Sequence, residues 1–248
     1  MKYIREDQVD LLGAAELLLL PGAVLINDSR LLFLLKNVRL TLSQRMFTLC
    51  KPLILASASP RRKQFLSDLG LHCLCLPAAL AEIPLPEEMP AAFALRMAEE
   101  KVALIAQQHP ESWVLGADTV VTLDNQIIGK PIDANQALAI LRTLRGQTHQ
   151  VITGLALICR QANCVESLTE TTEVTFADFP DEVLAAYVNT GEPLDKAGAY
   201  GIQAGGAFLV RNVQGSCSNV IGLPVDICLN LLLRHGIIAA AVKTGLVF

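Results

Sequence analysis

A short apolar strand followed directly by two arginines is the most informative feature of the sequence. Residues 53–62 read Leu-Ile-Leu-Ala-Ser-Ala-Ser-Pro-Arg-Arg. Ser59 is a favourable helix N-cap, and Pro60 suits the first helical position, where its missing N–H is not needed. A helix N-terminus attracts phosphate, and Arg61 and Arg62 add forked donors that match phosphate oxygens. The segment therefore predicts a site for a phosphorylated small molecule; the alternative is a surface helix start with two solvated arginines.

Asp118 stands among apolar residues in the predicted strand 113–123. A carboxylate in such surroundings is costly unless it has partners, so it is a candidate general base or metal ligand. The alternative is an aspartate at a bulge that bonds to nearby backbone. Lys130 follows a second short apolar run, and it either reaches a phosphate as a point charge or is a solvated loop lysine.

Two later loops carry polar residues in mixed order. Residues 192–203 read Glu-Pro-Leu-Asp-Lys-Ala-Gly-Ala-Tyr-Gly-Ile-Gln and show no helix or strand period. Glu192 and Asp195 could hold a divalent cation such as magnesium, and the Gln203 amide could pair with a base edge. The glycine-rich residues 215–224 lead into a helix start and could add backbone donors for phosphate, although capping alone would explain much of this pattern.

The elements that must position these residues alternate from residue 52 onward. Apolar periodicity predicts, in order, strand 53–56, helix 60–69, strand 71–76, helix 91–107, strands 113–123 and 127–128, helix 133–144, strands 150–159 and 166–176, helix 180–189, strand 208–213 and helix 224–235. The two long strands in the middle predict an antiparallel hairpin. The pattern therefore predicts an α/β fold with a mixed, twisted sheet flanked by helices.

The composition narrows the class of protein. A chain of 248 residues, 52% hydrophobic, suits one α/β domain with or without an appendage. The net charge of -4 argues against binding to a nucleic-acid polymer, which normally requires a basic face, whereas a nucleotide needs only a few local cations. Seven cysteines without a C-x-x-C pair, and four scattered histidines, predict buried thiols in a reducing cytoplasm and no structural zinc.

Residues 1–45 differ from the rest of the chain. The apolar run over residues 11–26 is interrupted by an acidic residue, a proline and a glycine, so it predicts neither a membrane-spanning helix nor a signal peptide. We expect Met46, or a residue near it, to be the functional start. Residues 1–45 would then be an accessory or poorly ordered extension of a domain over residues 46–248; the alternative is an accessory hairpin that packs on that domain.

Several common catalytic motifs are missing from the sequence. It contains no P-loop, no G-x-G-x-x-G and no G-x-S-x-G elbow. His149 stands at a strand entry with no nucleophile nearby in the sequence, so it is interpreted as a hydrogen-bonding residue.

Taken in series, six segments resemble the Maf family of nucleoside triphosphate pyrophosphatases. These segments are residues 55–62, 116–120, 129–131, 146–149, 192–203 and 215–224. They stand in the family's order and spacing over about residues 52–236. Each segment alone is modestly specific, whereas all six together are strongly specific.

The resemblance implies an inosine-triphosphatase-like α/β fold, a homodimer, and a site in a cleft across the sheet. It also implies divalent-metal-dependent hydrolysis of a nucleoside triphosphate to the monophosphate and pyrophosphate. Residues 195–203 are similar to the branch that acts on dTTP and UTP. The family's catalytic base falls on Asp118, and its substrate-selecting positions fall on Arg61, Thr119 and Gln203.

The sequence departs from the family pattern at two places. Cys217 stands where the family usually carries an aromatic residue. The acidic position after the second strand maps to Glu82, but the neighbouring acidic residue common in the family is Ala81 here. Metal binding by this loop is therefore less firmly implied than the rest of the site.

The resemblance leads to a mechanistic hypothesis. Glu82 and Asp118 would hold Mg²⁺ or Mn²⁺, and Asp118 would activate a water that attacks the α-phosphorus. The groups expected to hold the triphosphate are Ser59, Arg61, Arg62, Lys130 and Lys196. Two other activities stay open: a nucleotide-binding regulator of cell division and septum formation without essential catalysis, and a magnesium-dependent phosphatase that releases orthophosphate. The sequence ranks none of dTTP, UTP and modified pyrimidine nucleotides above the others.

Overall fold

The computed structural model describes residues 46–241, and the expected extension over residues 1–45 lies outside the described residues. The strands are β1 (Phe47–Leu49), β2 (Leu53–Leu55), β3 (Leu74–Cys75), β4 (Trp113–Leu123), β5 (Gln126–Ile128), β6 (Thr148–Cys159), β7 (Cys164–Phe176), β8 (Val210–Gln214) and β9 (Ile238–Ala240). The helices are α3 (Pro60–Asp68), α4 (Pro90–Gln108), α5 (Ala134–Leu144), α6 (Asp181–Val188), α7 (Cys217–Ile221) and α8 (Val225–Arg234), with short 3-10 turns η2 (Glu192–Asp195), η3 (Ala197–Ala199) and η4 (Gly205–Leu209).

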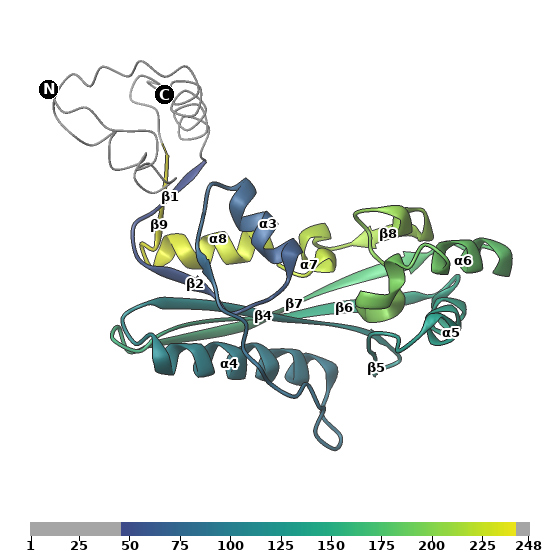
Figure 1. Cartoon of the computed structure of the whole chain (residues 1–248), viewed down its shortest axis with the longest axis horizontal. Coiled ribbons are helices and arrows are strands. Elements are labelled where there is room, and N and C mark those ends of the chain that lie inside the picture. The colour runs from purple at the N-terminus through teal and green to yellow at the C-terminus, as the bar shows by residue number, and fades with distance from the viewer. Residues whose placement is uncertain (1–45, 242–248) are drawn as a thin grey trace, which may run out of the picture. The chain divides into compact units, whose positions relative to one another are not determined.

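One mixed sheet organises the described chain (Figure 1). Its strand order is β3-β2-β4-β6-β7-β8, and β5 pairs with β4 outside this path. Strand β2 runs parallel to β3 and β4, whereas the pairs β4–β6, β6–β7 and β7–β8 are antiparallel. The β6–β7 register runs from Thr148 opposite Thr175 to Cys159 opposite Cys164. The predicted mixed α/β fold with a long antiparallel hairpin is therefore confirmed.

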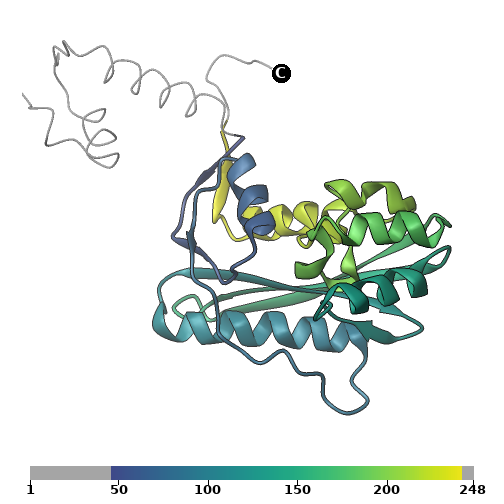
Figure 2. The same ribbon diagram turned by 45° about the vertical axis from the view of Figure 1, so that its right-hand side comes forward.

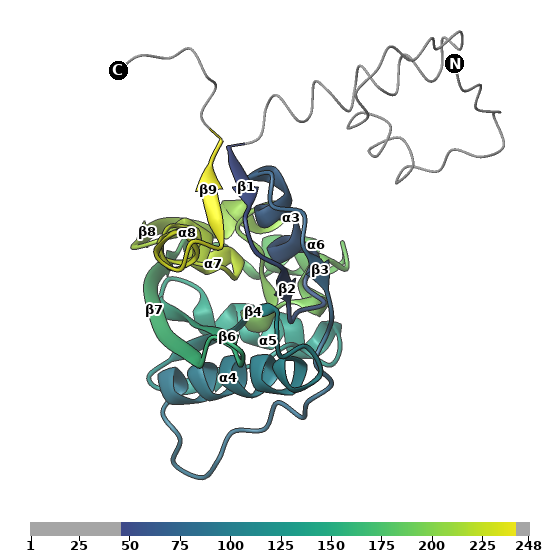
Figure 3. The ribbon, with the colours of Figure 1, turned by 90° about the vertical axis from the view of Figure 1, so that its left-hand side faces the viewer.

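Helices cover both faces of this sheet. Helix α4 lies on one face, and α3, α7 and α8 lie on the other (Figures 1 and 3). Side chains alternate across a strand, so consecutive residues of β4 reach different layers. Val114 packs in a cluster with Val102 of α4, and Leu115 packs in a cluster with Leu231 of α8. Helices α5 and α6 contact each other at one end of the sheet, as Figure 2 shows.

Two glycines allow α4 to approach the sheet closely. A Cβ on Gly154 of β6 would lie 2.2 Å from the backbone oxygen of Ala94. A Cβ on Gly116 of β4 would lie 2.4 Å from Cγ2 of Val102. Only glycine fits where backbones approach this closely. The close contact seats the side chains of α4 directly against the middle of β4.

Four short elements differ from the prediction. The expected strand over residues 71–76 is reduced to β3, and the sequence indicated neither α7 nor the pairing of β1 with β9. Strands β1 and β9 have three residues each, so their pairing depends on a contact between distant parts of the chain. Within residues 46–241, no helix is both long enough and apolar enough to cross a membrane.

The prediction of buried thiols is right in part. Cys159 and Cys228 are buried, and all seven cysteines are free. The prediction is wrong for Cys50 and Cys217, which are exposed. Cys50 lies in the bend after β1, and Cys217 is the first residue of α7.

Candidate active site

A cleft of about 710 Å³ opens where β2 ends. The nine residues that the family resemblance and its mechanistic hypothesis place in the site all line this cleft: Ser59, Arg61, Arg62, Glu82, Asp118, Thr119, Lys130, Lys196 and Gln203. They come from the start of α3, the loop before α4, the middle of β4, the loop after β5 and the segment from η2 to η4. The structure therefore brings the predicted residues together, and the role of each stays a prediction.

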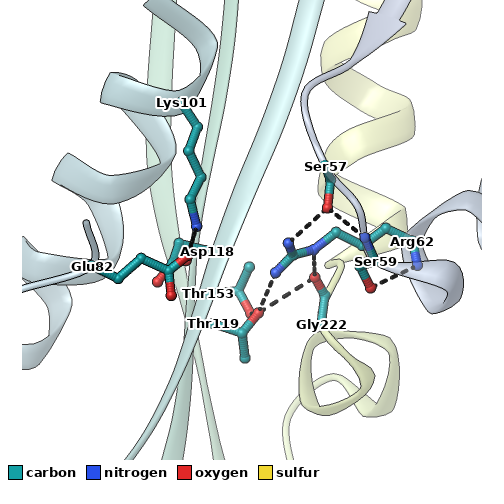
Figure 4. Close-up of polar contacts among 9 residues, drawn as sticks. All are labelled: Ser57, Ser59, Arg62, Glu82, Lys101, Asp118, Thr119, Thr153 and Gly222. Carbon is teal, nitrogen blue, oxygen red and sulfur yellow. Dashed lines mark hydrogen bonds and ion pairs between the residues drawn. The ribbon is translucent and has the colours of Figure 1, made fainter. Parts of the chain in front are cut away.

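A buried lysine connects the two carboxylates of the cleft (Figure 4). Lys101 Nζ on α4 donates to Asp118 Oδ1 at 2.6 Å and to Glu82 Oε1 at 2.5 Å. Lys101 and Asp118 are only 8% and 7% exposed. Two buried charges of opposite sign need each other, because either one alone would be strongly destabilising.

Sequence reasoning missed Lys101. The residue lies one helical turn after Met97, on the face of α4 that also buries Ala98 and Val102. A lysine on the apolar face of a helix is a signal of a buried anionic partner, because an unpaired lysine there is very rare. The prediction of that helix used only its apolar residues, so the charge among them was not interpreted.

The surroundings shift the pKa values of the two carboxyl groups in opposite directions. Burial raises the pKa of Asp118, although the charge and hydrogen bond of Lys101 oppose this effect. Burial would also raise the pKa of Glu82, but that residue is more exposed, and the hydrogen bond and charge of Lys101 lower its pKa overall. Asp118 is therefore the more basic carboxylate and the better candidate for accepting a proton.

Arg62 is held by hydrogen bonds from three segments. Its Nε donates to the Gly222 oxygen at 2.7 Å, its Nη2 to Thr119 Oγ1 at 3.0 Å and its Nη1 to Ser57 Oγ at 3.2 Å. Its backbone N–H donates to Ser59 Oγ, so the predicted N-cap of α3 is confirmed. Burial lowers the pKa of Arg62, yet a guanidinium stays charged at neutral pH. The side chain thus presents a fixed positive charge at the cleft wall.

Thr119 connects this arginine to the interior of the sheet. Its hydroxyl lies 2.9 Å from that of Thr153 on β6, whose hydroxyl donates to the Asn219 oxygen of α7 at 3.3 Å. Asn219 Nδ2 in turn donates to Val151 and to Thr172. This buried network fixes α7 to the sheet. It was not predicted, because it depends on pairing between strands and a helix that are distant in sequence.

Arg61 and Asp195 are charged side chains of the cleft that are more exposed. Arg61 Nη1 lies 3.8 Å from Asp195 Oδ2, with side chains 36% and 72% exposed. Lys196 Nζ donates to Asp195 Oδ1 at 2.6 Å. Arg61 therefore has far fewer protein contacts than Arg62 and is freer to bind an anion.

Glu192 has a different role from the expected one. Its carboxylate accepts hydrogen bonds from the Tyr187 hydroxyl at 3.1 Å and from the Gly205 N–H at 3.0 Å. These bonds fix the loop that carries Gln203. The expectation that Glu192 pairs with Asp195 to hold a cation is not supported, because each carboxylate already has separate protein partners.

Lys130 and Gln203 are both exposed at the cleft. The charge of Lys130 contributes to the lowered pKa of Glu82. The loop of Lys130 is fixed to η3 by a hydrogen bond from the Gly198 N–H to the Gly129 oxygen at 3.1 Å. The cleft therefore combines a cationic rim, a helix start and a pair of carboxylates.

His149 is a buried hydrogen-bonding residue, as the sequence indicated. Its Nε2 and the Tyr200 hydroxyl share a hydrogen bond of 2.8 Å, and its ring packs edge-on against Phe176. Burial lowers its pKa to about 4. Tyr200 lines the cleft, so His149 supports the wall of the cleft from behind.

Comparison with known proteins gives a consistent family assignment. A family profile described as "Maf-like protein" matches residues 52–235. A dTTP/UTP pyrophosphatase of Desulfotalea psychrophila is 48% identical over 194 residues, which are 78% of this chain and 100% of that protein. Proteins with the same name from Nitratidesulfovibrio vulgaris and Myxococcus xanthus are 48% and 46% identical, over 77% and 75% of this chain and 91% and 93% of their own lengths.

One solved structure also shows a slight likeness. It is a nucleoside-triphosphatase / dITP/XTP pyrophosphatase from Mycobacterium abscessus, with a TM-score of 0.34 and 16% identity over 52% of this chain and 76% of that one. This likeness is too slight to bear on function.

Proposed function

The chain belongs to the Maf family, and from this premise we propose that it hydrolyses dTTP, UTP and related pyrimidine nucleoside triphosphates to the monophosphate and pyrophosphate. The observation that carries the proposal is the shared cleft, in which Asp118 lies with the arginine-bearing start of α3. One group can activate water and the other can bind phosphate, and both are needed to hydrolyse a phosphoanhydride. The relatives named dTTP/UTP pyrophosphatase support the choice of substrate.

The start of α3 binds the triphosphate in this proposal. The backbone N–H and the guanidinium of Arg61 donate to phosphate oxygens, while Arg62 supplies a fixed charge from the cleft wall. Lys130 and Lys196 neutralise further charge from the facing loops. Binding and orientation by these groups hold the α-phosphorus on the side of the cleft where Asp118 lies.

Asp118 accepts a proton from the attacking water. Its pKa is raised by burial, which makes it a stronger base than an exposed aspartate, and Lys101 keeps the carboxylate oriented. The Gln203 amide selects the nucleobase of the substrate through its donor and acceptor groups at the rim of the cleft. The Thr119 hydroxyl accepts a hydrogen bond from Arg62 and shares another with Thr153. It therefore fixes the distance between the phosphate-binding wall and the general base Asp118.

The carboxylates fit a divalent cation. Glu82 and Asp118 are hard oxygen donors that already converge on one ammonium group, so the pair lies close enough to share a charge. We propose that both residues hold Mg²⁺ or Mn²⁺, which would neutralise the charge of the departing pyrophosphate. Lys101 would then interact with the outer side of the same carboxylates.

A single assay separates this proposal from its alternatives. Purified full-length protein is incubated with Mg²⁺ and each of dTTP, UTP, dCTP, dATP and GTP, and the products are separated by anion exchange. We expect monophosphate and pyrophosphate in equal amounts, with dTTP and UTP turned over fastest. Orthophosphate as the first product would indicate the phosphatase, and nucleotide binding without turnover would indicate the division regulator.

We also propose a homodimer in the cytoplasm, without a nucleic-acid or membrane partner. The resemblance supports the dimer, and the acidic net charge supports the absence of a nucleic-acid partner. Light scattering of the purified chain measures the oligomeric state directly. A monomeric mass at micromolar concentration would contradict the proposed dimer without affecting the proposed reaction.

A further inference from the structure

Three side chains with metal-binding atoms meet away from the cleft. They are Cys164 and Glu166 of β7 and His235, the residue that ends α8, and their donor atoms all lie within 4.8 Å of one another. His235 Nε2 lies 2.5 Å from Glu166 Oε1 and 3.9 Å from Cys164 Sγ. We propose that these three residues form a zinc site that fixes the end of α8 to the turn end of the β6–β7 hairpin.

The arrangement follows from the strand and from the end of the helix. Cys164 and Glu166 are two residues apart on β7, so their side chains leave the same face of the sheet. That face is the one covered by α8, and the ring of His235 packs at a tilt of 39° against Trp113 of β4, with 4.9 Å between centroids. Lys51 Nζ donates to the His235 oxygen at 2.6 Å and fixes its backbone. The backbone and the ring of His235 are therefore each held by one contact that a metal would not disturb.

The chemistry of the donors favours zinc over the harder cations. A thiolate, an imidazole and a carboxylate are the ligand types that Zn²⁺ binds, whereas Mg²⁺ and Ca²⁺ prefer oxygen alone. Tetrahedral bonds of about 2.3 Å to sulfur and about 2.0–2.1 Å to nitrogen place those two ligands about 3.6 Å apart. The observed 3.9 Å between Cys164 Sγ and His235 Nε2 is already close to this value. Three protein ligands leave the fourth position to water.

Binding requires only small movements. A metal between Glu166 and His235 would replace the proton of their hydrogen bond, so the two atoms would separate by somewhat less than 1 Å. The thiol of Cys164 would release its proton to solvent as the thiolate binds the metal. Glu166 Oε2 would keep its ion pair with Arg234 Nη2, at 3.0 Å, and this contact would orient the ligating carboxylate.

This site is separate from the carboxylates of the cleft. Trp113, which contacts His235, precedes Asp118 by five residues on β4, a separation of about 16 Å at about 3.3 Å per residue. The sequence predicted no structural zinc because His235 stands 71 residues from Cys164, far outside any local ligand spacing. Only the packing of α8 on the sheet brings the two residues together. An ordinary ion pair between Glu166 and His235 is the competing interpretation.

Cobalt is a suitable probe, because a cobalt–thiolate bond gives a charge-transfer band that oxygen ligands do not give. We titrate the full-length, chelator-treated protein with Co²⁺ and then with Zn²⁺. We expect the band to saturate at one cobalt per chain and to disappear when Zn²⁺ displaces the cobalt. The carboxylates Glu82 and Asp118 cannot produce this band, so the result does not depend on the proposed reaction.

Variants identify the ligands. Cys164→Ser and His235→Gln should weaken metal binding by more than about 100-fold, since losing an outer-shell partner alone costs about 10–100-fold. Cys217→Ser is the matched control, because it removes an exposed thiol outside the cluster and should leave the band unchanged. Zn²⁺ should also raise the midpoint of thermal unfolding for the wild type and not for Cys164→Ser.

The proposal is overturned by any of three results. These are a wild-type titration without a thiolate band, a band that survives Cys164→Ser, and a midpoint of thermal unfolding that Zn²⁺ leaves unchanged in the wild type. The wild-type titration needs no variant, so a variant that fails to fold does not remove the test.

Discussion

Lys101 of α4 and Asp118 of β4 form an ion pair of 2.6 Å between a helix and the strand beneath it. Both side chains are buried, so the pair depends on the close approach of α4 to the sheet at Gly116 and Gly154. The contact orients the carboxylate and limits the rise in its pKa that burial causes. The packing of α4 on the sheet therefore affects the orientation and the pKa of the carboxylate that is the proposed base.

Replacing the proposed base tests the mechanism. Asp118→Asn keeps the shape and one hydrogen-bond acceptor for Lys101, but it cannot take a proton from water. We expect turnover of dTTP and UTP to fall by about 100-fold or more, within the usual range for a lost general base. Pyrophosphate release measures the rate, and circular dichroism checks that the variant is folded. Turnover near that of the wild type would remove Asp118 from the mechanism.

Removing the partner of Asp118 should change the pH dependence of the rate. Lys101 lowers the pKa of Asp118, so Lys101→Met should raise that pKa further. Because the reaction needs the carboxylate form, the rate falls on acidification, and the acid limb of kcat/KM should move to higher pH. A nearby opposite charge shifts a carboxyl pKa by about 1–3 units, so we expect a displacement of about one unit or more.

The control for this experiment is Lys63→Met, which removes an exposed lysine of α3. Its pH profile should match that of the wild type. If Lys101→Met lowered the rate equally at every pH, Lys101 would support the fold without adjusting the base.

The two neighbouring arginines should respond differently to substitution. Arg62 makes three side-chain hydrogen bonds that lysine cannot reproduce. Arg62→Lys should lower the free energy of unfolding by about 2–3 kcal/mol, at about 1 kcal/mol for each lost bond. Urea unfolding of the variant and of the wild type measures this difference. An unchanged unfolding midpoint would mean that these contacts contribute little to stability.

Arg61→Ala should instead affect catalysis. Its ion pair with Asp195 is exposed and should contribute less than about 1 kcal/mol to stability. We expect kcat/KM to fall about tenfold or more, the loss corresponding to one charged hydrogen bond to phosphate. Steady-state kinetics with dTTP and urea unfolding of the same sample separate the two effects. A large loss of stability with unchanged kinetics would contradict the assignment of Arg61 to phosphate.

The close packing of α4 on β6 gives a prediction about stability. In Gly154→Ala the new methyl group would meet the backbone oxygen of Ala94 at 2.2 Å, so the helix must move. We expect the free energy of unfolding to fall by about 3 kcal/mol or more, at the upper end for overpacked cores. Gly129→Ala, where nothing lies within 4 Å of the new atom, should stay within about 1 kcal/mol. Equal effects of the two substitutions would show that α4 has room to shift.

Local signals in the sequence were sufficient for much of the fold. The bounds of β4 and the N-cap of α3 match the prediction, because an apolar run and a Ser-Pro step act within a few residues. The short helix α7 was not predicted, because the strongest start signal in its segment is Pro224, the N-cap residue of α8. The nine predicted site residues were found because six motifs occur in the family's order. The helix or strand propensity of single residues would not have revealed them.

The features that the sequence did not predict depend on contacts between the sheet and the helices that cover it. Lys101 has no carboxylate near it in sequence, so its ion pair requires the packing of α4 on β4. Arg61 and Arg62 likewise differ because it is Arg62 that donates hydrogen bonds to Gly222 and Thr119. The two adjacent arginines look equivalent in the sequence. In the fold, Arg62 makes hydrogen bonds within the protein, whereas Arg61 stays at the rim of the cleft.

The buried histidine behind the cleft makes stability depend on pH. Burial lowers the pKa of His149 to about 4 in the folded chain from an ordinary value of 6.5. The folded state therefore holds the neutral imidazole, and the unfolded state gains a proton first on acidification. Its contribution is fully present above pH 6.5 and is lost as pH falls from 6.5 toward about 4. Since each pH unit of difference corresponds to about 1.4 kcal/mol, the loss should reach about 3 kcal/mol.

His149→Gln removes this titration and keeps a side chain that can bond to the Tyr200 hydroxyl. The variant should be less stable than the wild type at pH 7, because glutamine cannot reproduce the ring contact with Phe176. Its free energy of unfolding should nevertheless fall less steeply between pH 6.5 and 4.5, as measured by urea unfolding at a series of pH values. His72→Gln, at an exposed histidine, should keep the slope of the wild type. Parallel slopes for the wild type and His149→Gln would show that other groups cause the acid sensitivity, because the histidine would then have nearly the same pKa in both states.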